Sequence, residues 1–406
     1  MELEESIQDF VDSDSMVTIG ATVVTGFEKV AMEEIKEKIE HIDMTYIRGK
    51  IFIQMLPKAI SGLHKLLSVD NLFLVIKYVP HYVYPDEKEI MLKSLAKFPV
   101  GLPWDEVTKF WRLNLEHCKK PNKNKQSSKR VPNKHDMENN SEVRFRVTSS
   151  RAGKSQCVTS PDADLHFGGA LQDVTNWTVD LSHYNMEIFF SMGFDAIMIS
   201  MSLTYRSLHH RHISHFGKTT LKSTIAHNML RLCNIQTGDF VVDPMCGSGV
   251  IPIEGYAQWK NAFYLAADNA HPAIVRSSSN VKFLNKEYTK TKFPIDVLHW
   301  DATRMPWRTA TVDVCVTDLP FGKRLGSQAD NRKLYPSFLH EMARVSRLRT
   351  ARACLLTHDK RSIITALAKV SSLWKIKQSH TINIGGLRAG VYLLQRTITL
   401  AKDVVL

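Results

Sequence analysis

The sequence has no closely spaced cysteine pair and no long apolar run. Its six cysteines include no C-x-x-C pair, so their spacing does not predict a zinc or other metal site. Cys315 and Cys354 lie in apolar stretches, as reduced, buried thiols do, which favours a reducing compartment. No segment approaches the roughly 20 apolar residues that a membrane span requires, and the acidic N-terminus resembles neither a signal peptide nor an anchor. We therefore expect a cytoplasmic protein, with the nucleus as a second compartment, and no membrane partner.

Negative charge is scarcer than positive charge. The 53 Lys and Arg residues outnumber the 41 Asp and Glu residues, which gives a net charge of +12 and a pI of about 9.3. This balance favours a polyanionic partner such as nucleic acid, although a merely basic enzyme is an alternative. A chain of 406 residues is too long for one typical domain, and 44% hydrophobic residues are enough to form packed cores.

The N-terminal half predicts two α/β modules after an acidic tail, residues 1–16. The first module, residues 17–95, has the order β-α-β-β-α-β, which is typical of a ferredoxin-like fold. Its expected elements are a strand at 17–24, a helix at 27–40, two strands within 44–55, a helix at 57–67 and a strand at 71–79. The second module spans residues 96–208. Its expected elements are a strand from 143, a helix at 166–181 and strands at 186–192 and 196–204.

Basic residues are concentrated in and after residues 119–140. That segment has no apolar periodicity, so we interpret it as a flexible basic insert in the second module. Four cations on and after the following strand are candidate phosphate contacts, although they are also compatible with ordinary surface charge: Arg144, Arg146, Arg151 and Lys154.

The C-terminal part, residues 209–406, alternates short apolar strands with helices. The strands are expected at 240–243, 263–268, 296–302, 312–319 and 351–357, with a helix before them at 219–232. This alternation predicts a parallel, doubly wound sheet. An antiparallel hairpin, residues 381–385 and 390–397, is expected to close it. Ligands of such sheets bind outside the carboxyl ends of the strands.

Four of these strands end on or beside an aspartate: Asp243, Asp268, Asp301 and Asp318. One aspartate at a strand end is an ordinary turn or capping residue, but four on one edge indicate a ligand site. In the following "DPMCGSG" loop, Gly247 and Gly249 allow close approach of a ligand. The third position of a G-x-G-x-x-G fingerprint is Pro252, and an acid before the loop disfavours phosphate. The ligand is therefore expected to have a positive or neutral centre.

S-adenosylmethionine fits this pattern, because it combines a ribose, an adenine and a cationic sulfur without phosphate. Asp268 is placed to accept hydrogen bonds from ribose hydroxyls, and Asp301 to accept one from the adenine amine.

The segments "VVDPMCGSGVIPIEG", "AAD", "WDAT" and "TDLPFG" resemble the motifs of class I methyltransferases. More narrowly, residues 317–345 resemble the catalytic loop of the THUMP domain-containing tRNA guanosine-N2-methyltransferases. Residues 19–35, 144–174 and 382–392 are similar to the same family, and the similarity covers nearly the whole chain apart from the acidic tail and the basic insert. The resemblance implies an α/β protein in which a C-terminal class I, Rossmann-like, S-adenosylmethionine-dependent methyltransferase domain follows ferredoxin-like and THUMP modules. It also implies that four residues line the methionine end of the cofactor: Asp243, Cys246, Gly247 and Gly249.

The "DLPF" turn is the expected catalytic centre. An exocyclic amine is a poor nucleophile, and the Asp318 carboxylate and the Leu319 carbonyl can accept its hydrogens and favour the developing charge. Pro320 stiffens the turn, and Phe321 offers a face on which an extruded base can stack. Leu319 stands where the family usually has proline, which we expect to loosen the backbone slightly. Two cations follow and either hold phosphates or are simply solvated: Lys323 and Arg324.

The resemblance implies methylation of N2 of a guanosine in the tRNA acceptor stem, at guanosine 6. It further implies that the THUMP module holds the acceptor end and that a small zinc-containing activator subunit binds the enzyme. Adenine-N6 and protein-glutamine methyltransferases use similar turns and are alternatives. A catalytically inactive RNA-binding scaffold is a third alternative, against which the intact set of aspartates argues.

Overall fold

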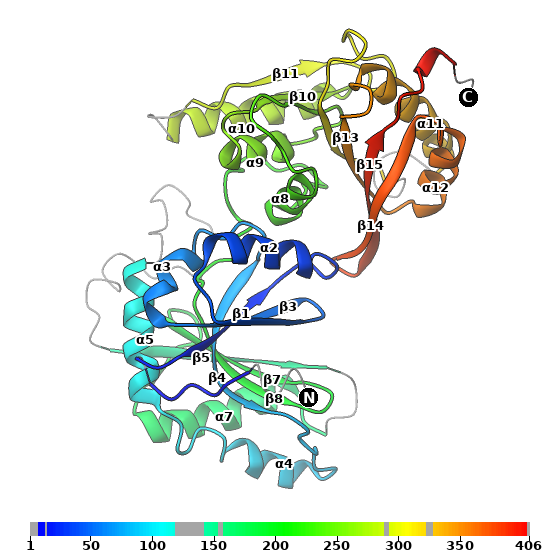
Figure 1. Ribbon diagram of the computed structural model, residues 1–406. Helices are drawn as coiled ribbons and strands as arrows, with labels where there is room; N and C mark the ends of the chain where they lie inside the picture. Colours follow the sequence, from blue (N-terminus) through cyan, green and yellow to red (C-terminus); the bar gives the residue numbers. More distant parts are fainter. Residues whose placement is uncertain are drawn as a thin grey trace. The chain divides into compact units, whose positions relative to one another are not determined.

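The computed structural model describes residues 7–12, 14–117, 142–152, 157–287, 292–321 and 328–403. The chain forms two compact units, one of Met1–Val23 with Met32–Leu208 and one of Val24–Ala31 with His209–Leu406. Each unit contains a sheet with helices (Figure 1). No helix within the described ranges is long and apolar enough to cross a membrane. The domain boundaries expected from the sequence stay predictions.

The first part of the first unit has the ferredoxin-like topology. Its elements are β1 (Val17–Thr22), α2 (Glu28–Lys38, which belongs to this unit from Met32 on), β2 (Asp43–Ile47), β3 (Lys50–Met55), η1 (Pro57–Ala59), α3 (Ile60–Leu63) and β4 (Asn71–Val79). The strands lie in the order β2-β3-β1-β4, and all neighbours are antiparallel. This arrangement agrees with the β-α-β-β-α-β pattern read from the sequence.

The second part of this unit extends the same sheet. It contains α4 (Lys88–Leu95), α5 (Trp104–His117), β5 (Arg144–Arg151), α7 (Ser160–Thr175), β6 (Thr178–Val179), β7 (Met186–Met192) and β8 (Ile197–Ser202). β4 pairs with β8, so the two expected modules share one eight-stranded sheet of order β2-β3-β1-β4-β8-β7-β5-β6. In β4, the five consecutive residues from Leu72 to Ile76 are buried, as in a strand with neighbours on both edges and both faces covered.

The position of α7 differs from the expected helix at 166–181. α7 begins six residues earlier because Thr159 caps it: the Asp162 amide donates to the Thr159 hydroxyl (3.2 Å), and the Thr159 amide donates to the Asp162 carboxylate (2.8 Å). The hydrogen bonds from Thr159 lower the pKa of Asp162 to about 2. Asn176, at φ 56°, ends the helix, and residues 178–179 form β6 instead. The T-x-x-D capping pattern was readable in the sequence and was missed.

Removing the Thr159 hydroxyl should destabilise the first unit. Thr159→Ala loses the acceptor for the Asp162 amide, so the free energy of unfolding should fall by about 1 kcal/mol. Urea denaturation followed by circular dichroism measures this change. Thr159→Ser keeps the hydroxyl and should remain close to the unaltered protein; equal loss in both variants would contradict the capping role.

The second unit contains a seven-stranded, doubly wound sheet. Its elements are α8 (Ser223–Leu232), β9 (Phe240–Asp243), α9 (Val250–Gln258), β10 (Phe263–Asp268), α10 (His271–Glu287), β11 (Ile295–His299), β12 (Val314–Asp318), α11 (Gln328–Val345), β13 (Arg352–Thr357), α12 (Lys360–Lys369), β14 (Trp374–Ile384), β15 (Leu387–Arg396) and η2 (Ala401–Asp403). The order is β11-β10-β9-β12-β13-β15-β14; the first five strands are parallel, and β15 is antiparallel to both of its neighbours, β13 and β14. The expected fold class is confirmed. The strand order reverses between β9 and β12, where ligands of such sheets bind.

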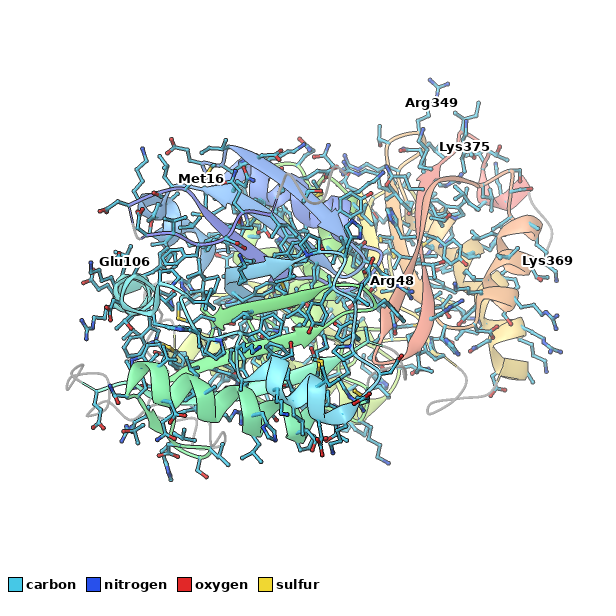
Figure 2. The ribbon with its side chains drawn as sticks, turned by 90° about the horizontal axis from the view of Figure 1, so that it is seen from below. Met16, Arg48, Glu106, Arg349, Lys369 and Lys375 are labelled. Carbon is cyan, nitrogen blue, oxygen red and sulfur yellow. The ribbon has the colours of Figure 1, made fainter. Side chains whose placement is uncertain are left out.

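One face of α11 anchors the core of this unit. Tyr335, Phe338, Leu339 and Met342 have the i, i+3, i+4, i+7 spacing of a single helix face and are fully buried among residues of the sheet and α12. Burial of each such side chain contributes roughly 1.5–3 kcal/mol. Charged side chains, labelled in Figure 2, point outward from the same unit: Arg349, Lys369 and Lys375.

The cysteines of the described segments are free thiols: Cys157, Cys233, Cys246, Cys315 and Cys354. Within those segments, no three His, Cys, Asp or Glu side chains gather where they could hold a metal ion.

Candidate functional site

Three of the predicted aspartates meet at one edge of the second sheet. Asp243 ends β9 and lies beside Ala266 of β10, so Asp268 reaches two residues further along the parallel neighbour. Cys315 of β12 pairs with the residue before Asp243, so Asp318 also reaches two residues beyond the level of Asp243. Two strand residues span about 6.6 Å, and an even spacing places the three side chains on the same side of the sheet.

Asp243 is buried, and its hydrogen bonds offset only part of the cost of burying its charge. Its Oδ1 accepts from the Thr317 hydroxyl (2.8 Å) and from the Met245 amide (3.3 Å). Burial raises the pKa of Asp243 to about 7, a rise that the nearby Asp268 increases and the two hydrogen bonds reduce. A cationic ligand would favour the ionised form, because it replaces part of the lost solvation with an attractive charge.

The glycine loop after β9 is hydrogen-bonded to Asp268, and there is open space beside its first glycine, Gly247. The Gly247 amide donates to Asp268 Oδ2 (3.0 Å), and Gly247 (φ 56°) and Gly249 (φ 77°) are both left-handed. A Cβ atom on Gly247 would meet nothing within 4 Å, whereas one on Gly249 would lie 3.2 Å from the Ser277 Cβ. Gly249 is therefore needed for packing, and Gly247 lines an open cradle that fits a ligand close to the backbone.

Cys246 belongs to the wall of this loop. Its amide donates to the Ala267 carbonyl (2.8 Å), and its Sγ lies 3.3 Å from the Ser277 hydroxyl. Burial, with the Asp243 charge beside it, raises the pKa of the Cys246 thiol well above its ordinary value. The thiol stays neutral and positions the loop.

Asp301 lies after β11 and not within it. The expected strand at 296–302 ends at His299, and Asp301 is exposed. Its Oδ1 accepts from both the amide (2.8 Å) and the hydroxyl (2.9 Å) of Thr303, which is a local turn contact. Contact of Asp301 with adenine stays a prediction.

Asp318 has a buried carboxylate oxygen without a donor. Its Oδ1 has no hydrogen-bond partner among the residues that the structure describes. Burial, followed by the charge of Asp243, raises the pKa of Asp318 well above its usual range. An unpaired buried oxygen is costly and needs an explanation, such as a donor supplied by a ligand. An amine N–H meets this requirement.

A backbone hydrogen bond holds Leu319 in the turn. Its amide donates to the Leu356 carbonyl of β13 (2.9 Å), and its side chain is only 1% exposed. Proline has no N–H group and could not make this bond. This hydrogen bond restrains the backbone at Leu319, and a looser backbone than with proline stays a prediction.

Pro320 and Phe321 complete the turn. The Pro320 carbonyl accepts from the Tyr335 hydroxyl (2.6 Å) and from the Asn331 side-chain amide (3.0 Å). Sequence reasoning missed Asn331 and Tyr335, although they follow the predicted catalytic turn at i, i+4 spacing. Phe321 is half-buried, and its ring centroid lies 6.1 Å from that of His358 at an angle of 44°.

The arginines predicted to contact phosphate differ in their intramolecular contacts. Arg146 pairs with Glu187, and its guanidinium lies 4.4 Å from the centre of the Tyr184 ring. Arg151 donates to a backbone carbonyl (2.8 Å), and Arg144 is half-buried. These contacts give Arg146 and Arg151 intramolecular roles, and phosphate binding by any of the three stays a prediction. The remaining predicted cations lie outside the described residues: Lys154, Lys323 and Arg324.

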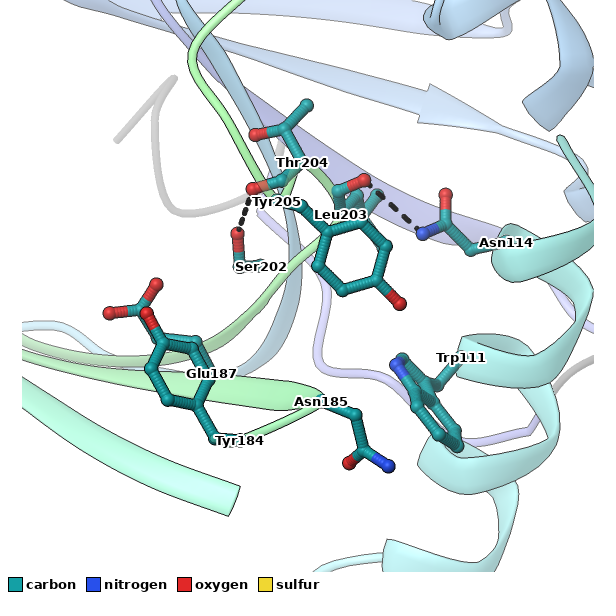
Figure 3. A pocket seen from close by; sticks show the side chains of 9 residues that line it. All are labelled: Trp111, Asn114, Tyr184, Asn185, Glu187, Ser202, Leu203, Thr204 and Tyr205. Carbon is teal, nitrogen blue, oxygen red and sulfur yellow. Dashed lines mark hydrogen bonds between the residues drawn. The ribbon is translucent and has the colours of Figure 1, made fainter. Parts of the chain in front are cut away.

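A small cavity in the first unit is lined by aromatic rings (Figure 3). Trp111, Tyr184 and Tyr205 contribute to its wall, and its volume is about 10 Å³. That volume accommodates about one water molecule and is too small for a nucleobase. We therefore assign this cavity no ligand.

Comparison with known proteins identifies the family. The methyltransferase domain described as RMKL-like (UPF0020) matches residues 211–390. The tRNA (guanine(6)-N(2))-methyltransferase THUMP3 of Bos taurus is 38% identical, over 94% of this chain and 88% of the relative. The chain belongs to this THUMP3 family. The Homo sapiens member is 37% identical, over 95% of this chain and 89% of its own. Family membership identifies the chain as a methyltransferase and confirms the resemblance found in the sequence.

Solved structures support the fold of this THUMP3-family chain. TrmN from Thermus thermophilus superimposes with a TM-score of 0.72 at 20% identity, covering 94% of this chain and all of TrmN. At this identity the similarity shows the fold.

A methyl group on Gly247 should block the cradle. Gly247→Ala should lower the affinity for S-adenosylmethionine at least tenfold, because the added methyl group would exclude part of the ligand. A tenfold loss corresponds to about 1.4 kcal/mol. Calorimetric titration measures the affinity.

Gly238→Ala is the matched control for backbone strain. Gly238 (φ 85°) also has nothing within 4 Å of its Cβ position, but it precedes β9 and so lies at the opposite end of that strand. Both alanines should cost about 1–2 kcal/mol of stability from left-handed strain. Equal affinities in the two variants would contradict the cradle.

Proposed function

We propose that this chain transfers the methyl group of S-adenosylmethionine to the exocyclic N2 of a guanosine in tRNA, at position 6 of the acceptor stem. The observation that carries the chemistry is the buried Oδ1 of Asp318, which accepts no hydrogen bond from any residue that the structure describes and lies on the same sheet edge as the Gly247 cradle. The names of the THUMP3 relatives support the nucleotide and its position.

The cofactor supplies a methyl group on a cationic sulfur. The rest of the reaction depends on the turn: Asp318 and the Leu319 carbonyl accept the two amine hydrogens and draw the nitrogen lone pair out of conjugation. As the nitrogen–carbon bond forms and the sulfur–carbon bond breaks, the amine becomes acidic. Its proton passes to Asp318, the carboxylate that already accepts one of its hydrogen bonds; burial raises the pKa of this group, which favours its protonated form after the transfer.

The base must leave its stack to reach this turn. Phe321 offers a half-buried ring face at its end, and stacking of a base on such a ring is worth on the order of 1–3 kcal/mol. Cofactor contacts follow the edge of the sheet: Asp243 and the glycine loop hold the methionine end, Asp268 the ribose and Asp301 the adenine.

The first unit is the natural place for the remaining tRNA contacts. Its THUMP module holds the acceptor end, with Arg144, Arg146 and Arg151 as candidate phosphate contacts. From the family resemblance we also propose a small zinc-containing activator subunit, which should raise turnover when added to the purified chain. The free thiols fit a reducing compartment, cytoplasm or nucleus.

Asp318→Ala should stop the reaction and leave cofactor binding nearly unchanged. Turnover should fall by at least about a hundredfold to a thousandfold, the range for losing one transition-state contact. Calorimetry should show S-adenosylmethionine binding within about twofold of the unaltered protein, which is about 0.4 kcal/mol. Asp296→Ala, which removes an exposed carboxylate of β11, is the control. Equal loss of cofactor binding would contradict the assignment of Asp318.

Cofactor affinity should depend on pH through Asp243. Its pKa of about 7 leaves it largely protonated at about pH 6 and largely ionised at about pH 8, so affinity should rise about five- to tenfold between them. The free protein should show the opposite trend, because the raised folded-state pKa contributes stability below about pH 4 that is lost as pH rises through 7. Asp243→Asn should flatten the dependence of affinity and weaken that of stability, to which Asp318 also contributes. A pH-dependent affinity that survives in this variant would contradict the role.

Mass spectrometry of nucleosides tests the proposed reaction. tRNA is incubated with the chain, the activator and methyl-labelled cofactor, and Asp318→Ala serves as the blank. The expected product is labelled N2-methylguanosine at position 6. Labelled N6-methyladenosine would favour the adenine alternative, and no cofactor binding would favour the scaffold.

A further inference from the structure

The Pro320 carbonyl is held by two buried side chains from α11. Tyr335 and Asn331 are 0% and 1% exposed, and they donate to this one carbonyl over 2.6 Å and 3.0 Å. They lie four residues apart, so they share one face of the helix. A carbonyl oxygen has two lone pairs, and both donors together saturate it.

The same two side chains are themselves fixed. The Tyr335 hydroxyl lies 2.8 Å from the hydroxyl of Thr357, which ends β13. The Asn331 amide also lies 3.2 Å from Oδ2 of Asp359, whose Oδ1 caps α12 by accepting from the Ser362 amide (3.1 Å). The network therefore joins the end of β12 to α11, β13 and α12, and all of its side chains are buried.

The consequence concerns which backbone oxygen is available to the target base. Pro320 directly follows Leu319, whose amide is tied to Leu356. Among the described residues, no hydrogen bond ends on the Leu319 carbonyl. With the next carbonyl saturated, the Leu319 oxygen is the backbone acceptor beside Asp318 for which the described residues supply no donor.

We propose that Tyr335 and Asn331 are positioning residues. By fixing the Pro320–Phe321 peptide on one side of Pro320, while the Leu319 amide is tied to Leu356 on the other, they hold the turn so that the Leu319 carbonyl is aimed at the target amine. This inference rests on the proposed methylation of an exocyclic amine. It adds that the two side chains act on the turnover step through the backbone and touch neither cofactor nor RNA.

A buried tyrosine hydroxyl needs a partner in any protein, so a matched control is required. Tyr264 supplies it: its side chain is 3% exposed, and its hydroxyl donates to the Trp259 carbonyl (3.0 Å) within the same unit. Tyr264→Phe and Tyr335→Phe each remove one buried hydroxyl bound to one backbone carbonyl.

Steady-state kinetics with tRNA and labelled cofactor provide the first measurement. Tyr335→Phe should lower kcat about tenfold to a hundredfold, because a displacement of about 1 Å at the reacting groups has effects of that size. KM for cofactor and tRNA should stay within about twofold, since neither ligand is contacted. Tyr264→Phe should keep both constants.

Asn331→Ala provides a second variant on the same carbonyl. Because the two donors share one acceptor, the loss of kcat in the double variant Tyr335→Phe, Asn331→Ala should differ from the product of the single losses. Hydrogen exchange gives a readout that is independent of activity. The Leu319 amide should exchange faster in Tyr335→Phe than in the unaltered protein, and its exchange rate should not change in Tyr264→Phe.

The outcomes separate this inference from the proposed function. If the unaltered protein does not methylate tRNA, the proposed function fails, and the exchange experiment still tests the turn. If the unaltered protein is active and Tyr335→Phe matches Tyr264→Phe in kcat and in exchange, the positioning role is overturned. A rise in KM for tRNA at constant kcat would also overturn it.

Discussion

The site depends on the parallel pairing of β9 with β10 and β12. Parallel strands end at the same edge of a sheet, so this single register brings Asp243, Asp268 and Asp318 together, with the last two at equal height. A slip of β12 by one residue would turn Asp318 to the opposite face of the sheet. The apolar residues of β12 and the buried face of α11 prevent such a slip, so the core of the second unit also determines the geometry of its chemistry.

The buried carboxylates at this edge of the sheet lower the stability of the free chain but favour ligand binding. Burial raises the pKa of Asp243 and of Asp318. The charge of Asp268 adds to the rise at Asp243, and the charge of Asp243 adds to the rise at Asp318. Folded proteins retain such costs mainly where a ligand relieves them. In the proposed function, the cationic sulfonium is the partner of Asp243, and the amine that donates a hydrogen bond is the partner of Asp318. The same groups therefore destabilise the free chain and favour its occupied form.

Much of this site was predictable because strand periodicity and strand-ending aspartates are local signals. The seven strands of the second unit, and Asp243, Asp268 and Asp318 at its edge, follow from them. Pairings between distant segments were not predictable: β4 with β8, the Leu319 amide with Leu356, and Arg146 with Glu187 each need a partner that no local pattern reveals. The early start of α7 is different, because its capping pattern was present in the sequence.

The most direct test of the account is a crystal structure of the chain with S-adenosylhomocysteine. We expect the ligand at the carboxyl edge of the second sheet, with its ribose hydroxyls on Asp268, its amino acid end along Gly247 and its sulfur facing the turn that begins at Asp318. A ligand bound elsewhere, or one at this edge with its sulfur turned away from Asp318, would contradict the account.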